Sequence, residues 1–279
     1  MDILIATGGS PHSHLAIALG GEVASATGGA VTLLCVTETG SRDCQAVFRE
    51  SAPLLAAFGE YRALVRHGQP AEEILRETEE DAYDLVIVGE KGHHTPLTRF
   101  LLGPTAERVA TSAHLPVLVA KGDPEGPLPG PIRNVLLAVS LRRKEEDVER
   151  VLRRAAEIAK GTGATVTVLH VMSQMPIPPA GSPEDWEAPA TELQAQATRE
   201  GQLLQYVTRR LEADGIATQA AVRHGLVVDE ILTESREGEY ELLVVGGHEP
   251  GSWLQNLVLE NVALQIVHRA RIPVLTVHG

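Results

Sequence analysis

The feature that most constrains the fold of this chain is an internal duplication. The segment Val65–Gly68, which reads VRHG, returns as Val222–Gly225, and the same offset of 157 residues maps Glu73–Leu75 onto Glu230–Leu232. The match continues without a gap through YDLVIVGEKG and YELLVVGGHE, and then through LPVLVA and IPVLTV. An ungapped match of this length indicates a duplicated domain. At 279 residues the chain is also long enough for two domains that each bury a core.

The boundary between the copies lies in GDPEGPLPGP, whose four prolines and three glycines cannot continue a helix or a central strand. We therefore expect a first domain over residues 1–121, a linker over 122–131 and a second domain over 132–279. ILIATG pairs with VLLAVS at an offset of only 132, so the second copy carries about 25 extra residues. Most of them lie in the proline-rich and acidic stretch 173–192, which we interpret as a surface loop and a lid candidate.

Each copy alternates short β-branched runs with amphipathic stretches. In the first copy the expected strands are 2–7, 30–37, 61–66, 84–88 and 116–120, and the expected helices are 12–26, 44–58, 70–80 and 103–113. Such alternation predicts right-handed crossovers and a parallel sheet. The fold class is therefore α/β, with two Rossmann-like doubly wound domains, each a five-stranded parallel sheet flanked by helices. Ligands of such sheets bind at the carboxyl ends of the strands.

The composition excludes several classes of partner. A formal net charge of −13 leaves little attraction for nucleic acid or anionic lipid, so we expect neither as a partner. No stretch reaches the roughly 18 apolar residues of a membrane span, and MDILIA lacks a basic n-region, so we expect a cytoplasmic protein. Two cysteines are too few for a disulfide framework, although a single bridge stays open. We expect Cys35 to be a buried small hydrophobic residue of its strand.

The glycine turn ATGGSPHSH at residues 6–14 is the first candidate ligand site, because glycine lets the backbone approach an anion at a helix start. It is neither a P-loop nor a dinucleotide fingerprint. An S-G-G-x-D-S loop fails because Pro11 and His12 stand where Asp and Ser are needed, and His12 also breaks a G-x-S-x-G elbow. Since no general base or pair of metal-binding carboxylates is evident, we expect no catalytic residues and no efficient ATP hydrolysis.

The turn after the fourth strand carries the clearest motif, LVIVGEKGHHTPLTRFLLGPTAERVATSAHLPVLVA. With the first-strand turn and the closing PVLVA strand, it resembles the universal stress protein family, and the resemblance covers both copies in tandem. In that family a G-x-x-G turn and a later G-[ST] helix start hold the phosphates of ATP or AMP. A first-strand Asp and the backbone after the second strand hold the ribose and adenine. The resemblance implies ATP or AMP as ligand, with Mg²⁺ only as part of the nucleotide complex.

Carried over residue by residue, the resemblance implies a nucleotide site in the first domain. The candidate residues are Thr7, Gly8, Val36, Gly89, Lys91, Gly92, Gly103 and Thr105. Three departures weaken it: ten residues instead of nine separate Gly92 from Gly103, Pro104 stands at the hydroxyl position, and Gly8 replaces the ribose-binding Asp. The next hydroxyl, on Thr105, lies one residue after the position at which the family has Ser or Thr. A basic cluster in the loop, formed by Lys91, His93, His94 and Arg99, suits phosphate, the alternative being a solvated loop.

The second copy departs further from the motif. At the offset of 157, Gly92 becomes Glu249, Gly103 becomes Glu260 and Pro104 becomes Asn261, while Ser140 stands at the first-strand Asp position. Each carboxylate would repel a polyphosphate by up to about 4 kcal/mol at about 4 Å and an effective dielectric near 20. We expect nucleotide binding in the first domain only, with a neutral or cationic small molecule left open for the second.

Two further hypotheses concern metals and assembly. His12, His14, His93 and His94 lie in turns that should meet, but no carboxylate or thiolate is fixed beside them, so we expect no metal site. The resemblance suggests that the closing strands PVLVA and PVLTV pair antiparallel within one chain as a pseudo-dimer, and a homodimer stays open. The expected function is that of a stress-response regulator that binds a nucleotide. The alternative is a structural or interaction module without nucleotide.

Overall fold

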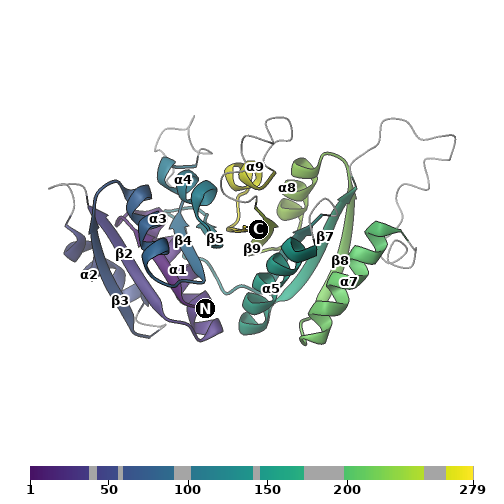
Figure 1. Ribbon diagram of the computed structural model, residues 1–279, viewed down its shortest axis with the longest axis horizontal. Helices are drawn as coiled ribbons and strands as arrows, with labels where there is room; N and C mark the ends of the chain where they lie inside the picture. The colour runs from purple at the N-terminus through teal and green to yellow at the C-terminus, as the bar shows by residue number, and fades with distance from the viewer. Residues whose placement is uncertain are drawn as a thin grey trace.

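The computed structural model describes residues 1–37, 43–55, 59–90, 102–140, 145–172, 198–247 and 262–278. Ten strands form one continuous sheet in the order β3-β2-β1-β4-β5-β10-β9-β6-β7-β8 (Figure 1). We use the terms first and second domain for the halves that carry β1–β5 and β6–β10. Between them, residues 121–133 contain no helix or strand.

The elements of the first domain lie within three residues of the predicted positions. Its strands are β1 (Ile3–Thr7), β2 (Val31–Thr37), β3 (Tyr61–His67), β4 (Leu85–Gly89) and β5 (Val117–Ala120). Its helices are α1 (Pro11–Thr27), α2 (Cys44–Leu55), α3 (Pro70–Glu80) and α4 (Pro104–Ser112). The largest difference is the end of α2, which was expected at residue 58; residues 56–58 lie outside the described residues.

The second domain repeats this order. Its strands are β6 (Asn134–Val139), β7 (Thr165–Met172), β8 (Thr218–His224), β9 (Leu242–Gly246) and β10 (Val274–Val277). Its described helices are α5 (Glu145–Thr162), α7 (Arg199–Ala213), α8 (Val227–Glu237) and α9 (Val262–Arg269). None of the helices in the described part of the chain combines the length and the apolar character needed to cross a membrane.

The closing strands join the two domains. β5 and β10 pair antiparallel, with Val119 opposite Val274 and Val117 opposite Thr276, which confirms the expected pairing of PVLVA with PVLTV. Both strands are fully buried, so the pairing covers two apolar edges that would otherwise invite association. All other neighbouring strands are parallel. The strands of the first domain therefore run opposite to those of the second, and the carboxyl ends of the two sets of strands lie on opposite sides of the shared sheet.

The helices cover both faces of the sheet. The core on one face contains side chains of α1, α2, α5 and α7, and the core on the other face contains side chains of α3, α4, α8 and α9. Strands covered on both faces are expected to be continuously apolar, and all seven residues of β2, VTLLCVT, are buried. The predicted α/β class with two doubly wound, Rossmann-like units is confirmed, although their sheets are fused into one.

Contacts between the domains continue beyond the sheet. α1 packs against α5, and the backbones come close at Gly161, where a Cβ would lie 2.3 Å from the carbonyl oxygen of Ala26. An ion pair of 3.2 Å joins Arg154 of α5 to Asp84, which precedes β4. The two halves of the V in Figure 1 are therefore connected through both strands and helices.

Candidate functional site

The candidate crevice of the first domain lies where the strand order reverses. β1 has β2 on one side and β4 on the other, and all three are parallel. β1 ends at Thr7 and β4 ends at Gly89, while α1 begins at Pro11 and α4 begins at Pro104. Two strand ends and two helix starts therefore meet at the edge where doubly wound sheets bind ligands.

Gly89 allows a close approach between two of these elements. A Cβ on Gly89 would lie 2.4 Å from the carbonyl oxygen of His12 and 3.0 Å from the amide nitrogen of Ser13. Side chains do not tolerate such distances, so only glycine fits where β4 ends against the first turn of α1. The structure thus brings Gly89, the first glycine of the motif after β4, against the helix start that follows the glycine turn of β1.

The turn after β1 satisfies its own polar groups. Thr7 is buried; its Oγ1 donates to Oγ of Ser13 over 3.2 Å and accepts from the amide of Gly9 over 3.3 Å. Ser10 is the N-cap of α1, and its Oγ accepts from the amide of Ser13 over 3.2 Å. Thr7 therefore orders the turn through its side chain. Its role as a ligand contact, like that of Gly8, stays a prediction.

The start of α4 differs from the start of α1. Its N-cap is Gly103, which has no side chain to accept a hydrogen bond from the first turn. Pro104 occupies the first helical position, where proline is well tolerated because that amide has no partner within a helix. The next amides, of Thr105 and Ala106, also lack intrahelical acceptors. Thr105 is half-buried, so α4 offers both amides and a hydroxyl to an anion.

A buried ion pair that the sequence analysis missed lies at the same edge. Nζ of Lys121, just after β5, donates to Oε1 of Glu90, just after β4, over 2.6 Å. The Lys121 side chain is only 1% exposed, and this burial lowers its pKa, although the charge of Glu90 opposes that shift. A lysine that ends an apolar strand is the signal that could have identified it.

The residue that the resemblance assigns to the adenine, Val36, belongs to β2. Val36 is buried near the end of that strand. The preceding residue, Cys35, forms a disulfide with Cys44, the first residue of α2. The single bridge left open by the sequence is therefore present, and the prediction that Cys35 is simply a buried hydrophobic residue was incomplete. No free cysteine exists in this chain.

Several predicted residues lie outside the described residues. They are Lys91, Gly92, His93, His94, Arg99, Glu249, Glu260, Asn261 and the stretch 173–192. Of the four histidines considered for a metal site, the structure describes His12 and His14, both in the first turn of α1. Within the described residues, no group of three or more His, Cys, Asp or Glu side chains could hold a metal ion.

The corresponding edge of the second domain has different chemistry. His170 takes the place of Cys35; it is buried, its Nδ1 lies 3.1 Å from the carbonyl oxygen of Val139, and burial lowers its pKa. At the offset of 157, Glu90 and Lys121 correspond to Gly247 and His278. A Cβ on Gly247 would lie 2.6 Å from Nδ1 of His278, so the imidazole occupies the space beside the glycine.

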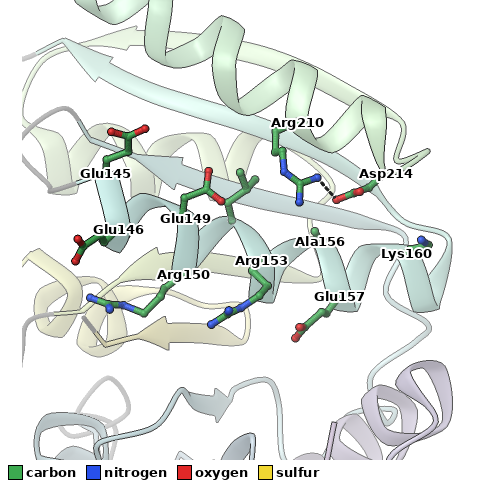
Figure 2. Close-up of a pocket in the computed structure, with 11 residues that line it drawn as sticks. Glu145, Glu146, Glu149, Arg150, Arg153, Ala156, Glu157, Lys160, Arg210 and Asp214 are labelled. Carbon is green, nitrogen blue, oxygen red and sulfur yellow. Dashed lines mark hydrogen bonds and ion pairs between the residues drawn. The ribbon is translucent and has the colours of Figure 1, made fainter.

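A separate groove of about 1080 Å³ runs between α5 and α7 (Figure 2). Its apolar lining residues are Leu152 and Ala156, and Figure 2 shows charged side chains on both sides, including the 2.6 Å ion pair of Arg210 with Asp214. Five acidic and four basic residues line it, so it has little net charge to attract an ion. Because it follows two helices, it is distinct from the crevice at the strand ends.

These features define a class: a tandem protein of two doubly wound α/β units in one sheet, with a glycine turn and a glycine N-cap at a helix start in the first unit. The family model described as the universal stress protein family matches residues 1–121 and 131–278. The chain therefore belongs to the universal stress protein family.

Solved structures of similar shape cover nearly the whole chain. A universal stress protein from Archaeoglobus fulgidus DSM 4304 is 19% identical, with a TM-score of 0.73 over 99% of this chain and 98% of the other. PA1789 from Pseudomonas aeruginosa PAO1 is 19% identical, with a TM-score of 0.70 over 100% of this chain and 92% of the other. At such identities the likeness establishes the fold.

A curated relative matches over a shorter segment. Universal stress protein MJ0531 from Methanocaldococcus jannaschii is 50% identical over 54 residues. That segment is 19% of this chain and 31% of the relative, so the chain spans less than a third of that protein's length.

Proposed function

We propose that the first domain binds an adenine nucleotide, ATP or AMP, and that the protein acts as a cytoplasmic stress-response regulator through binding, without efficient catalysis. The observation that carries this proposal is the start of α4, where the N-cap Gly103 supplies no side-chain acceptor, at the strand edge where Gly89 ends β4. Unpaired amides at a helix start and the positive end of the helix dipole favour a phosphate group. The start of α1 is already capped by Ser10, so the proposal places the phosphates at α4.

Family membership supports the choice of ligand class. A universal stress protein from Archaeoglobus fulgidus has been solved in complex with dAMP. In this chain the residues proposed to hold the phosphates are Gly89, Lys91, Gly92, Gly103 and Thr105. Thr7, Gly8 and the backbone of Val36 are proposed to line the nucleoside side. Mg²⁺ is proposed only as a companion of the bound nucleotide.

Binding without hydrolysis is supported by the state of the one carboxylate that directly follows β4. Glu90 is bound to Lys121 and is therefore not available as a general base for a water molecule. For the second domain we propose that adenine nucleotides do not bind, because Glu249 and Glu260 replace the motif glycines.

Calorimetric titration with Mg-ATP and with AMP tests this function. We expect a micromolar dissociation constant and about one nucleotide per chain. Gly92→Glu, which copies the residue of the second domain, should abolish binding. The matched control is Glu249→Gly, which makes the reverse change in the second domain and should leave the first-domain site intact. No saturation by either nucleotide up to millimolar concentration would contradict the proposal.

The second candidate function is an interaction module without nucleotide. The antiparallel pair of β5 and β10 favours it, because the chain is already assembled as an intrachain pseudo-dimer. A second chain would then bind through another surface, and sedimentation velocity would detect a homodimer. An interaction module predicts no heat of nucleotide binding, so the same titration distinguishes the two functions.

A further inference from the structure

The Glu90–Lys121 pair occupies a defined place in the first domain. Gly89 of β4 lies opposite Ala120 of β5, so Glu90 and Lys121 are the next register neighbours, and the amide of Glu90 donates to the carbonyl of Ala120 over 2.9 Å. Val88, one residue before Gly89, packs in the core that also contains α4. Because side chains alternate along a strand, Glu90 and Lys121 extend on the face covered by α4, at the edge where α4 begins.

The fold does not require this ion pair. The second domain builds the same strand ending with Gly247 and His278, and the amide of Gly247 donates to the carbonyl of Val277 over 2.7 Å. A buried ion pair also contributes little net stability compared with apolar residues of similar volume, because both charges lose hydration. The first domain thus keeps a costly pair where the second, whose sequence has lost the phosphate motif, does without it.

We propose that the Glu90–Lys121 pair determines the electrostatic potential at the phosphate side of the first-domain crevice, and so its preference for phosphorylated over neutral ligands. The inference rests on the proposed function. Lys121 balances the carboxylate that directly follows Gly89, so a phosphate at the start of α4 meets a neutral pair instead of an unpaired negative charge. Glu90 in turn limits how strongly the buried ammonium attracts anions.

This mechanism predicts effects of opposite sign for the two halves of the pair. Lys121→Met leaves the Glu90 carboxylate without a counter-charge and should weaken the binding of ATP and AMP roughly tenfold. Glu90→Gln keeps a hydrogen-bond acceptor of similar shape, leaves Lys121 unbalanced and should strengthen both nucleotides by a similar factor. The affinity for adenosine, which has no phosphate, should change less than about twofold in either variant. The double variant is neutral again and should return close to the wild-type affinity.

The experiment is a titration of the full chain with Mg-ATP, AMP and adenosine for the wild type, both single variants and the double variant. Thermal unfolding of each variant checks that it is folded. Should Lys121→Met fail to fold, Glu90→Gln and the double variant still test the sign. Lys160→Met, which removes an exposed lysine of α5, is the matched control and should leave all three affinities unchanged.

Three results would overturn the inference while leaving the proposed function intact: both single variants weaken ATP, adenosine changes as much as ATP, or no affinity changes. If the Glu90–Lys121 pair only holds the turn in shape, both single variants should weaken ATP binding. A wild-type chain that binds neither nucleotide would instead refute the proposed function, and this inference with it.

Discussion

Cys35 and Cys44 are joined by a disulfide that connects the second strand of the first domain to the first residue of α2, with their Cα atoms 5.8 Å apart. α2 packs directly on the β1–α1 turn, because Val47 Cγ2 lies 3.0 Å from where a Cβ on Gly9 would be. The bond therefore holds one wall of the candidate crevice. The second domain has His170 in place of Cys35, so the bond belongs to the first domain alone.

Loss of this disulfide should destabilise the first domain. A bridge that closes a loop of about ten residues contributes roughly 2–3 kcal/mol by limiting the unfolded chain. We expect Cys44→Ser to lower the free energy of unfolding by that amount in urea, measured without reductant. A reductant should lower the free energy of unfolding of the wild type by a similar amount, once mass spectrometry detects the free thiols. It should have no effect on the double variant Cys35→Ala with Cys44→Ala. Equal stability of reduced and oxidised wild type would refute this.

Removal of the buried carboxylate Glu77 should be costly. Its side chain is 4% exposed, accepts from Nε of Arg66 over 2.6 Å and accepts from the hydroxyl of Tyr83 over 2.7 Å. Glu77→Ala removes one of three carboxylates from Arg66, which keeps Glu73 and Glu80, and the loss should be about 1–3 kcal/mol in urea unfolding. Glu234→Ala removes the equivalent residue of the second domain, which is 16% exposed, and should cost less. A larger loss for Glu234→Ala would contradict the burial argument.

The contact between α1 and α5 leaves no room for a side chain at Gly161. A Cβ there would lie 2.3 Å from the carbonyl oxygen of Ala26, which is backbone and cannot rotate away. Gly161→Ala should therefore separate the helices and cost about 1–3 kcal/mol in thermal or urea unfolding. Gly130→Ala is the matched control, because nothing lies within 4 Å of its Cβ position. Indistinguishable stability of the two variants would show that α1 and α5 shift at no cost.

Glu22 should make stability depend on pH in the acidic range. Burial raises its pKa and Glu241 adds to the rise, while the amide of Ile132, which donates to Oε1 over 2.5 Å, opposes it. Because the pKa of Glu22 is higher in the folded state than in the unfolded state, its contribution to the free energy of unfolding is fully present below the unfolded pKa of about 4.3. This contribution is lost as pH rises through the folded pKa. Glu22→Gln keeps the acceptor without the charge, so it should be more stable than wild type near pH 7.

The measurement is urea unfolding of wild type and Glu22→Gln from acidic to neutral pH. The advantage of the variant should disappear below about pH 4, where Glu22 itself is protonated. A difference that is independent of pH would refute a titration of Glu22 as its cause.

The elements of the fold were predictable to different degrees. The duplication and the alternation of apolar runs located all five strands of the first domain, because buried parallel strands are written as continuous apolar stretches such as VTLLCVT. The antiparallel pairing of β5 with β10 followed from the resemblance to a family. The same pairing fuses the two sheets into one, and local patterns alone did not predict it, since it depends on how the halves dock.

The candidate site was predictable where a single residue type serves a local purpose. Gly89 and Gly103 were identified as turn and helix-start residues, and both occupy those places. Thr7 was proposed as part of the nucleotide site, and the described partners of its hydroxyl, Ser13 and Gly9, belong to the turn that follows β1. Local sequence could not separate these roles, because both need a polar group at the end of β1.

The sequence by itself determined that this chain forms two copies of one α/β unit and where the strands of the first copy fall, because side-chain periodicity is a local property. Only the tertiary structure decided which distant residues meet. Lys121 and Glu90 are 31 positions apart and become neighbours through the register of β5 on β4, and Cys35 reaches Cys44 because α2 folds back onto β2. Charge balance and crosslinking depend on distances in space, which the strand order sets.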